Sequence, residues 1–212
     1  MKTFISYETE LKQLFLSIIA SPTQHAKWLN TLSYLENCGA RKIAACEHPT
    51  LVKEEMLKHA AEEFRHAHHL KRQIEKITSD CLPDYSADYT LGNTGSLHYL
   101  QMLDVETCRY LKTIKLENSE IRSHAYALVT FAIELRAEEL YKIYSTCLKE
   151  TKSRVSVNSI LLEEKEHLNE MRENIAAMPN GEHHANVICR FESVLFSRFY
   201  AAVKNRLLDQ LD

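Results

Sequence analysis

The chain has 212 residues, 45% of them hydrophobic, and a net charge of −3, so we expect residues 1–212 to form one domain with a substantial core. The small net charge and the lack of a dense Lys/Arg run argue against nucleic-acid and membrane partners, and no stretch approaches the roughly 20 apolar residues that span a bilayer. The N-terminal segment lacks a secretory hydrophobic region and the 6 Cys lack CxxC spacing, which predicts a cytoplasmic protein with reduced thiols.

Long segments with apolar residues at helical spacing, interrupted by only 4 Gly and 4 Pro, predict an all-α fold. In chain order, a short amphipathic helix comes first. The second helix begins at Ser21-Pro22, an N-cap followed by a proline at the first helical position. Pro49, Pro83 and Pro179 mark later breaks. The predicted helices cover residues 3–19, 22–46, 50–79, 96–117, 119–150, 153–177 and 183–210.

Two Glu-x-x-His motifs, each preceded by a lone glutamate, are the most informative feature of the chain. The intervals from the lone glutamate to the motif are similar, at 27 and 30 residues. In a chain with 11 His such a motif arises readily by chance, so its setting has to decide whether it matters. The residues concerned are Glu36, Glu63 and His66 in the first half and Glu134, Glu164 and His167 in the second.

The four glutamates of this pattern are predicted to point inward, because their neighbours one and two helical turns away are apolar. Glu36, for example, shares its face with Leu29 and Leu32. Glu62 and Glu163, which directly precede the two motif glutamates, share their faces with charged and polar residues. We therefore expect Glu62 and Glu163 to be solvated.

Four ionised carboxylates in one apolar interior would repel each other and lose hydration, at a cost of several kcal/mol per ion. No Lys or Arg lies close to the glutamates on their stripes, whereas two divalent cations would balance the four charges and the two histidines would add neutral nitrogen donors. The break at Pro49 also lies midway between Glu36 and Glu63, which places both at one level of an antiparallel hairpin. In the second hairpin, the break lies less nearly midway between Glu134 and Glu164. The pattern predicts a dinuclear metal site.

With these residues the chain resembles the ferritin-like superfamily of diiron carboxylate proteins. The second half is most similar to a rubrerythrin-type pattern, in Ala132-Ile133-Glu134 and in the segment 161–168. The resemblance implies a ferritin-like four-helix bundle. The predicted helices add flanking N- and C-terminal helices and one in the crossover, and with this crossover helix the chain departs from the family's storage and electron-transfer members. By role, the resemblance implies that Glu36 and His66 bind one metal, that Glu134 and His167 bind the other, and that Glu63 and Glu164 bridge them.

Several further residues are candidates whose role the sequence leaves open. His59 lies one turn before Glu63 and is either an additional ligand or a hydrogen-bonded core histidine. Glu138 is the best alternative carboxylate ligand, Tyr141 is either a partner of the site or a packing residue, and Asp104 either reaches a substrate pocket or pairs at the surface. The remaining histidines singled out, at 68, 69, 183 and 184, are expected at the surface.

The leading functional hypothesis is a diiron oxidoreductase that activates O2 or peroxide, takes electrons from an external donor and oxidises a small or apolar substrate. Two alternatives are a ferroxidase that handles iron without an organic substrate and a bundle that binds metal without catalysis. The metal pair is expected to be iron, with Mn/Fe, Mn or Zn as alternatives. The last helix is expected to cover the bundle or to form a homodimer contact. The sequence assigns no catalytic residue beyond the ligands.

Overall fold

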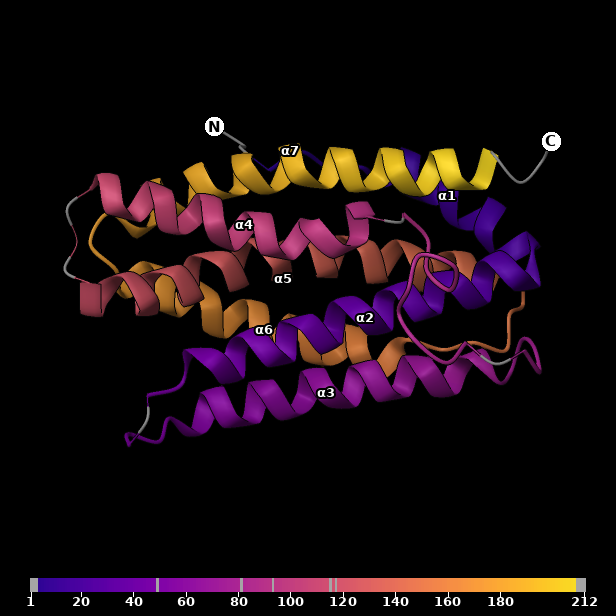
Figure 1. The fold of residues 1–212 in the computed structure, drawn as a ribbon, viewed down its shortest axis with the longest axis horizontal. Coiled ribbons are helices and arrows are strands. Elements are labelled where there is room, and N and C mark those ends of the chain that lie inside the picture. Colours follow the sequence, from indigo (N-terminus) through magenta and orange to yellow (C-terminus); the bar gives the residue numbers. More distant parts are fainter. Residues whose placement is uncertain are drawn as a thin grey trace.

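The computed structural model describes residues 4–48, 50–80, 82–92, 94–114, 116 and 118–208, and within these ranges it has seven helices and no strand (Figure 1). The prediction of an all-α fold is therefore confirmed. The helices are α1 (Glu8–Ala20), α2 (Pro22–Cys46), α3 (Glu54–Ile74), α4 (Thr94–Thr113), α5 (Asn118–Glu150), α6 (Asn158–Ala177) and α7 (Gly181–Leu208).

The start of α2 follows the sequence signal closely. Ser21 is extended and its hydroxyl accepts a hydrogen bond from the Gln24 amide at 3.5 Å, while Pro22 occupies the first helical turn. The first helix, by contrast, begins at Glu8, because the preceding backbone binds other helices. The Ile5 amide donates to Ser193 at 3.2 Å and the Tyr7 amide donates to Glu139 at 3.0 Å. These tertiary bonds replace the first helical turn that periodicity alone predicted.

The other helices agree with prediction in number and order but are shorter at several ends. Helix α3 begins at Glu54 and ends at Ile74. Val52, within the predicted helix 50–79, precedes the helix and is 77% exposed. Helix α6 begins at Asn158, five residues later than predicted. Three predicted helix boundaries lie outside the described residues, at 3, 117 and 210. Pro49 and Cys81 lie outside them as well. The five described cysteines are free thiols, as expected.

The helices that carry the predicted metal site pack as two antiparallel pairs. Helix α2 lies beside α3 and α5 lies beside α6, and the two pairs run along the long axis of the molecule (Figure 1). Helix α4 carries the chain from the first pair to the second, and together with α7 it packs on α5. Among the described helices none is long and apolar enough to cross a membrane.

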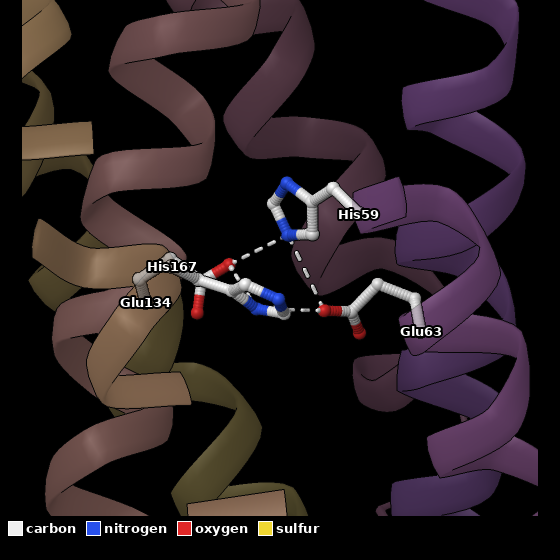
Figure 2. A group of neighbouring side chains, drawn as sticks. All are labelled: His59, Glu63, Glu134 and His167. Atoms are coloured by element: carbon white, nitrogen blue, oxygen red, sulfur yellow. Dashed lines mark hydrogen bonds and ion pairs between the residues drawn. The ribbon is translucent and has the colours of Figure 1, made fainter. Parts of the chain in front are cut away.

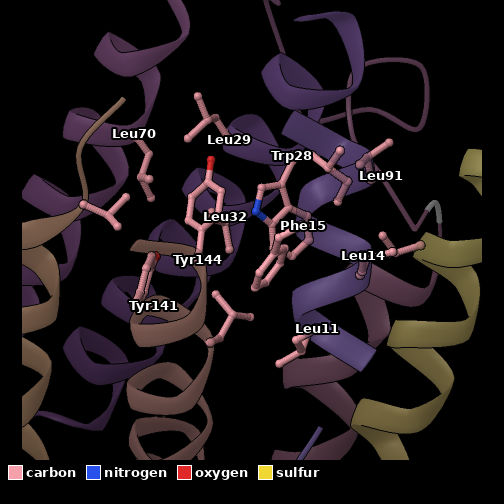
Figure 3. Packing of buried hydrophobic residues seen from close by; sticks show 14 of the residues in the cluster. Leu11, Leu14, Phe15, Trp28, Leu29, Leu32, Leu70, Leu91, Tyr141 and Tyr144 are labelled. Carbon is pink, nitrogen blue, oxygen red and sulfur yellow. The ribbon is translucent and has the colours of Figure 1, made fainter. Parts of the chain in front are cut away.

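Two apolar clusters enclose the middle of the helices. One gathers large rings between α1, α2 and α5, with the Trp28 ring 5.4 Å from Phe15 and 6.5 Å from Tyr144 between centroids (Figure 3). The other lies between the first half of α5 and the first half of α7. On α5, Glu134 lies between Leu140, which belongs to the first cluster, and Ala132, which belongs to the second. Apolar packing on both sides therefore keeps water away from the level at which the glutamates lie.

Candidate metal centre

The structure brings all six predicted site residues into one cluster at the centre of the four paired helices. Each Glu-x-x-His motif places its glutamate and histidine on one face of its helix, because residues three apart are neighbours on a helix. The potential ligand atoms form two groups, and within each group every atom lies within 4.8 Å of the others. One group comprises Glu36, Glu63, His66 and Glu164, and the other comprises His59, Glu63, Glu134 and His167 (Figure 2).

Glu63 belongs to both groups, which is the position expected of a bridging carboxylate. Its Oε1 lies 3.5 Å from His167 Nδ1, while its Oε2 lies 3.8 Å from His66 Nδ1. Glu164 Oε1 lies 3.2 Å from His66 Nδ1, on the side of the first group. The two groups therefore have Glu63 in common and surround two adjacent positions.

Five buried polar atoms of this cluster have no hydrogen-bond partner within the described part of the chain. Some have close neighbours, but without the alignment of a hydrogen bond. Buried polar groups left without partners are costly, so their convergence calls for a ligand that satisfies them. The atoms are Glu63 Oε1, His66 Nδ1, Glu134 Oε2, Glu164 Oε1 and His167 Nδ1. Oxygen and imidazole donors of this kind suit divalent transition metals, so these buried side chains can hold a metal ion.

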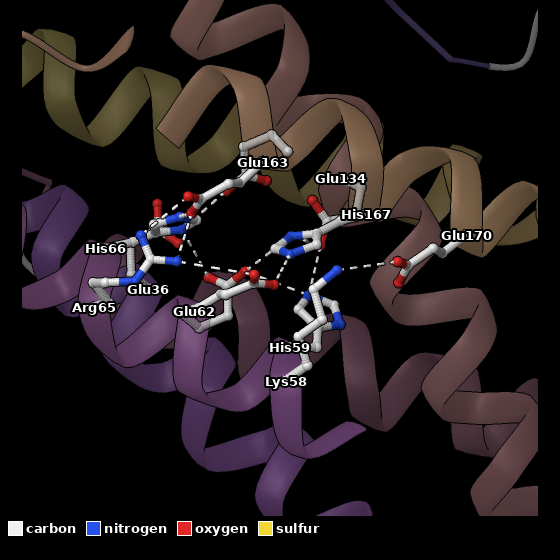
Figure 4. A network of polar contacts seen from close by, with 12 residues as sticks. Glu36, Lys58, His59, Glu62, Arg65, His66, Glu134, Glu163, His167 and Glu170 are labelled. Atoms are coloured by element: carbon white, nitrogen blue, oxygen red, sulfur yellow. Dashed lines mark hydrogen bonds and ion pairs between the residues drawn. The ribbon is translucent and has the colours of Figure 1, made fainter. Parts of the chain in front are cut away.

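The two motif histidines are oriented by carboxylates that the sequence placed in solvent. His66 Nε2 lies 2.6 Å from Glu163 Oε2, and His167 Nε2 lies 2.8 Å from Glu62 Oε2 (Figure 4). The expectation that Glu62 and Glu163 are fully solvated was wrong, since they are only 17% and 25% exposed. Each motif is in fact Glu-Glu-x-x-His, and its first glutamate reaches across to the histidine of the other motif. The repeated extra glutamate was the sequence signal that could have revealed this exchange.

These carboxylates leave the other ring nitrogen of each histidine free to face the cluster. An imidazole that donates Nε2–H to a carboxylate has its Nδ1 lone pair available, and such a partner also increases the basicity of a metal-binding histidine. Arg65 fixes one of the carboxylates, because its two terminal nitrogens each donate to Glu163 at 3.0 Å. The outer carboxylates thus select the tautomer that a metal would need.

The pKa values reflect the density of negative charge. Burial, followed by repulsion from Glu63, raises the pKa of Glu36 well above its usual range, and burial with repulsion from Glu164 does the same for Glu134. Burial opposes a charge on His66, but the nearby carboxylates of Glu164 and Glu63 outweigh it and raise the pKa of His66 to about 12. Protons therefore compensate part of the charge of these side chains, and cations at the same position would displace them.

A cavity of about 110 Å³ adjoins the cluster on the side of α2 and α5. Glu36, Glu63, Glu134 and Glu164 form one of its walls, and the remaining lining is mostly apolar and comes from α2, α4, α5 and α7. Gly39, one turn after Glu36, also lines it. Glu36 faces this space, which accounts for its being the one partly exposed member of the six.

Two tyrosines contact the cluster. The hydroxyl of Tyr141 donates a hydrogen bond to Glu36, and burial followed by the negative charge of Glu36 raises the pKa of Tyr141 well above its usual range. Tyr141 therefore remains a proton donor to that carboxylate. The Tyr126 hydroxyl lies 3.2 Å from His59 Nδ1 on the other side of the cluster.

The other residues singled out in the sequence lie outside the Glu/His cluster. Glu138 lines a separate groove with Glu8 and Lys12, and so does not join the cluster. Asp104 pairs with Lys42 at 3.0 Å, and both border the cavity. His184, expected at the surface, is buried and its Nδ1 lies 2.7 Å from the Tyr110 hydroxyl. The helical pattern did not show this, because the partner comes from α4.

Comparisons with protein-family models, with curated proteins and with solved structures return no match. The class of the protein therefore follows from its own fold and site: an all-helical protein with a buried Glu/His cluster that can hold metal.

Proposed function

We propose that the protein is a ferritin-like dinuclear metalloprotein that oxidises a small apolar substrate with O2 or peroxide. The observation that carries the proposal is the convergence of carboxylate and imidazole side chains from four helices on two adjacent positions, with five of their buried atoms unpartnered among the described residues. In this proposal Glu36 and His66 bind one metal, Glu134 and His167 bind the other, and Glu63 and Glu164 bridge them.

The donor set favours iron over other metals. Carboxylates are hard anionic ligands that stabilise the oxidised state of iron, and imidazole accommodates its reduced state. Two divalent ions would also balance the four carboxylates. The same ligands accept Mn, a mixed Mn/Fe pair or Zn, so metal content is part of the test. When bound, an iron pair supplies redox-active centres that reduce O2 or peroxide with electrons from an external donor.

The cavity favours an oxidoreductase over an iron-handling protein, because it provides an apolar space directly against the carboxylate wall. Its volume of about 110 Å³ is smaller than the roughly 150 Å³ cavity known to hold benzene, so its occupant is a small molecule. The apolar lining would exclude water and orient an apolar substrate towards Glu36 and Glu63. Tyr141 would keep Glu36 in place through its hydrogen bond.

The test is to add Fe(II) without oxygen, measure the bound iron, and then follow O2 uptake and the near-ultraviolet absorption of oxidised iron. We expect about two irons per chain and rapid O2 uptake. Glu63→Gln should lower the iron content sharply, while the control Glu166→Gln, on an exposed face of α6, should not. Iron uptake far above two per chain would instead indicate iron handling. Metal binding without O2 uptake would indicate a non-catalytic bundle.

A further inference from the structure

His59 lies on α3 four residues before Glu63 and faces the candidate metal centre. It is 2% exposed, and its Nε2 lies 3.2 Å from Glu134 Oε1 and 3.3 Å from Glu63 Oε1. Its ring also lies close to that of His167, with 4.1 Å between centroids (Figure 2). His59 thus meets carboxylates from two different helices at the point where the second group of potential ligands converges.

We propose that His59 is a seventh metal ligand, so that one metal position has two imidazoles and the other has one. The inference rests on the proposed dinuclear centre and goes beyond the six residues of the doubled motif. Besides the bridging Glu63 and Glu164, the nitrogen-rich position would comprise His59, His167 and Glu134, and the oxygen-rich position would comprise Glu36 and His66.

The contact with Tyr126 is compatible with a ligand role for His59. If Nδ1–H donates to the Tyr126 hydroxyl, 3.2 Å away, the Nε2 lone pair faces Glu63 and Glu134, as metal binding requires. The competing arrangement has the opposite tautomer, with Nε2–H donating to Glu134 and Tyr126 donating to Nδ1. In that case His59 is a core histidine that holds two carboxylates apart. The two roles differ in whether loss of the imidazole changes metal affinity.

A seventh ligand would make the two positions chemically unequal. With Glu63 and Glu164 as bridges each position has three carboxylates, but the nitrogen-rich position has two imidazoles and the oxygen-rich position has one, so the nitrogen-rich position suits ions that favour imidazole. Cobalt(II) and zinc(II) should therefore fill the nitrogen-rich position first. A centre with only the six motif ligands would have one histidine on each side and no such difference in nitrogen donors.

The test is a titration with Co²⁺, followed by calorimetry and by visible absorption, which reports the coordination of cobalt directly. We expect the native protein to bind in two steps of different affinity. His59→Phe, which keeps a ring of similar size, should weaken the first step by at least about 100-fold and change the second much less. Tyr126→Phe should weaken the first step by about 10–100-fold, since it removes only the group that orients His59. His68→Phe, an exposed position on the same helix, is the matched control.

The outcomes separate this inference from the function on which it rests. If the native protein binds two metals and takes up O2, but His59→Phe and Tyr126→Phe leave both cobalt steps unchanged, the seventh ligand is refuted and the dinuclear centre stands. If both steps weaken equally, His59 acts on the cluster as a whole and the inference also fails. If the native protein binds neither cobalt nor iron, the proposed function itself is wrong. Should His59→Phe not fold, the Tyr126→Phe titration still decides between the two roles.

Discussion

Gly39 is a glycine in the interior of α2 whose replacement by alanine should stabilise the protein. Glycine in a helix interior costs about 0.8–1.0 kcal/mol relative to alanine. A Cβ built at Gly39 would meet its nearest heavy atom, Glu63 Oε2, at 3.9 Å, which is ordinary van der Waals contact. Alanine therefore fits without strain, and Gly39→Ala should raise the free energy of unfolding by about 0.5–1 kcal/mol. For a chain of this size that is a rise in Tm of about 1–4 °C.

The matched control is Gly95→Ala in α4, where a Cβ would lie 2.9 Å from the Cβ of Ala202. That overlap requires a shift of packed helices, so this change should destabilise by about 1–3 kcal/mol. Both variants can be compared with the native protein by chemical denaturation. A loss of stability in Gly39→Ala would refute the reasoning, because it would mean that packing requires a glycine at this position.

If packing does not require Gly39, its role is to leave space at the cavity beside Glu63. If the proposed function holds, Gly39→Leu, which extends into that space, should still bind iron but take up O2 more slowly. Iron content and O2 consumption measured on the same sample separate these effects. Unchanged O2 uptake in Gly39→Leu would show that the proposed reaction does not use this cavity.

Three further predictions concern other parts of the structure. Glu163→Gln weakens the partner of His66 and should lower metal affinity about 10–100-fold in a metal titration; an unchanged affinity would contradict the orienting role. Glu192 is 0% exposed and accepts hydrogen bonds from Arg136 at 2.8 and 2.9 Å. Arg136→Met leaves Glu192 as a buried charge without a cation, so chemical denaturation should show a loss of about 3–5 kcal/mol in the free energy of unfolding. A loss under about 1 kcal/mol would contradict this reasoning. Burial lowers the pKa of His25 to about 4 from 6.5, because the folded protein favours the neutral ring. The stability that neutral His25 contributes is therefore fully present above pH 6.5, and about 3 kcal/mol of it is lost as the pH falls towards 4. The stability difference between the native protein and His25→Gln should shrink by that amount over this interval, and a constant difference would refute it.

The sequence by itself determined the helices and the inward direction of the four glutamates. Seven periodic segments became seven helices in the described residues, since the spacing of apolar residues reports which face of a helix is buried. The paired motifs with their lone glutamates also identified the six residues that the structure gathers at one level. Both results depend on how residues are placed within one helix or in two consecutive helices, and the spacing of residues along the sequence reports this placement.

The tertiary structure decided everything that depends on which side chain lies opposite. Glu62 and Glu163 had polar neighbours on their own helices, yet each bonds a histidine of the other pair, because the two motifs face each other across the bundle. The position of His59 between Glu134 and Tyr126 likewise became visible only in the tertiary structure, because both residues lie on another helix, α5. The late start of α1 has the same origin, since its preceding backbone bonds to α5 and α7. Periodicity records how apolar a face is, but not which donors and acceptors another helix brings to it.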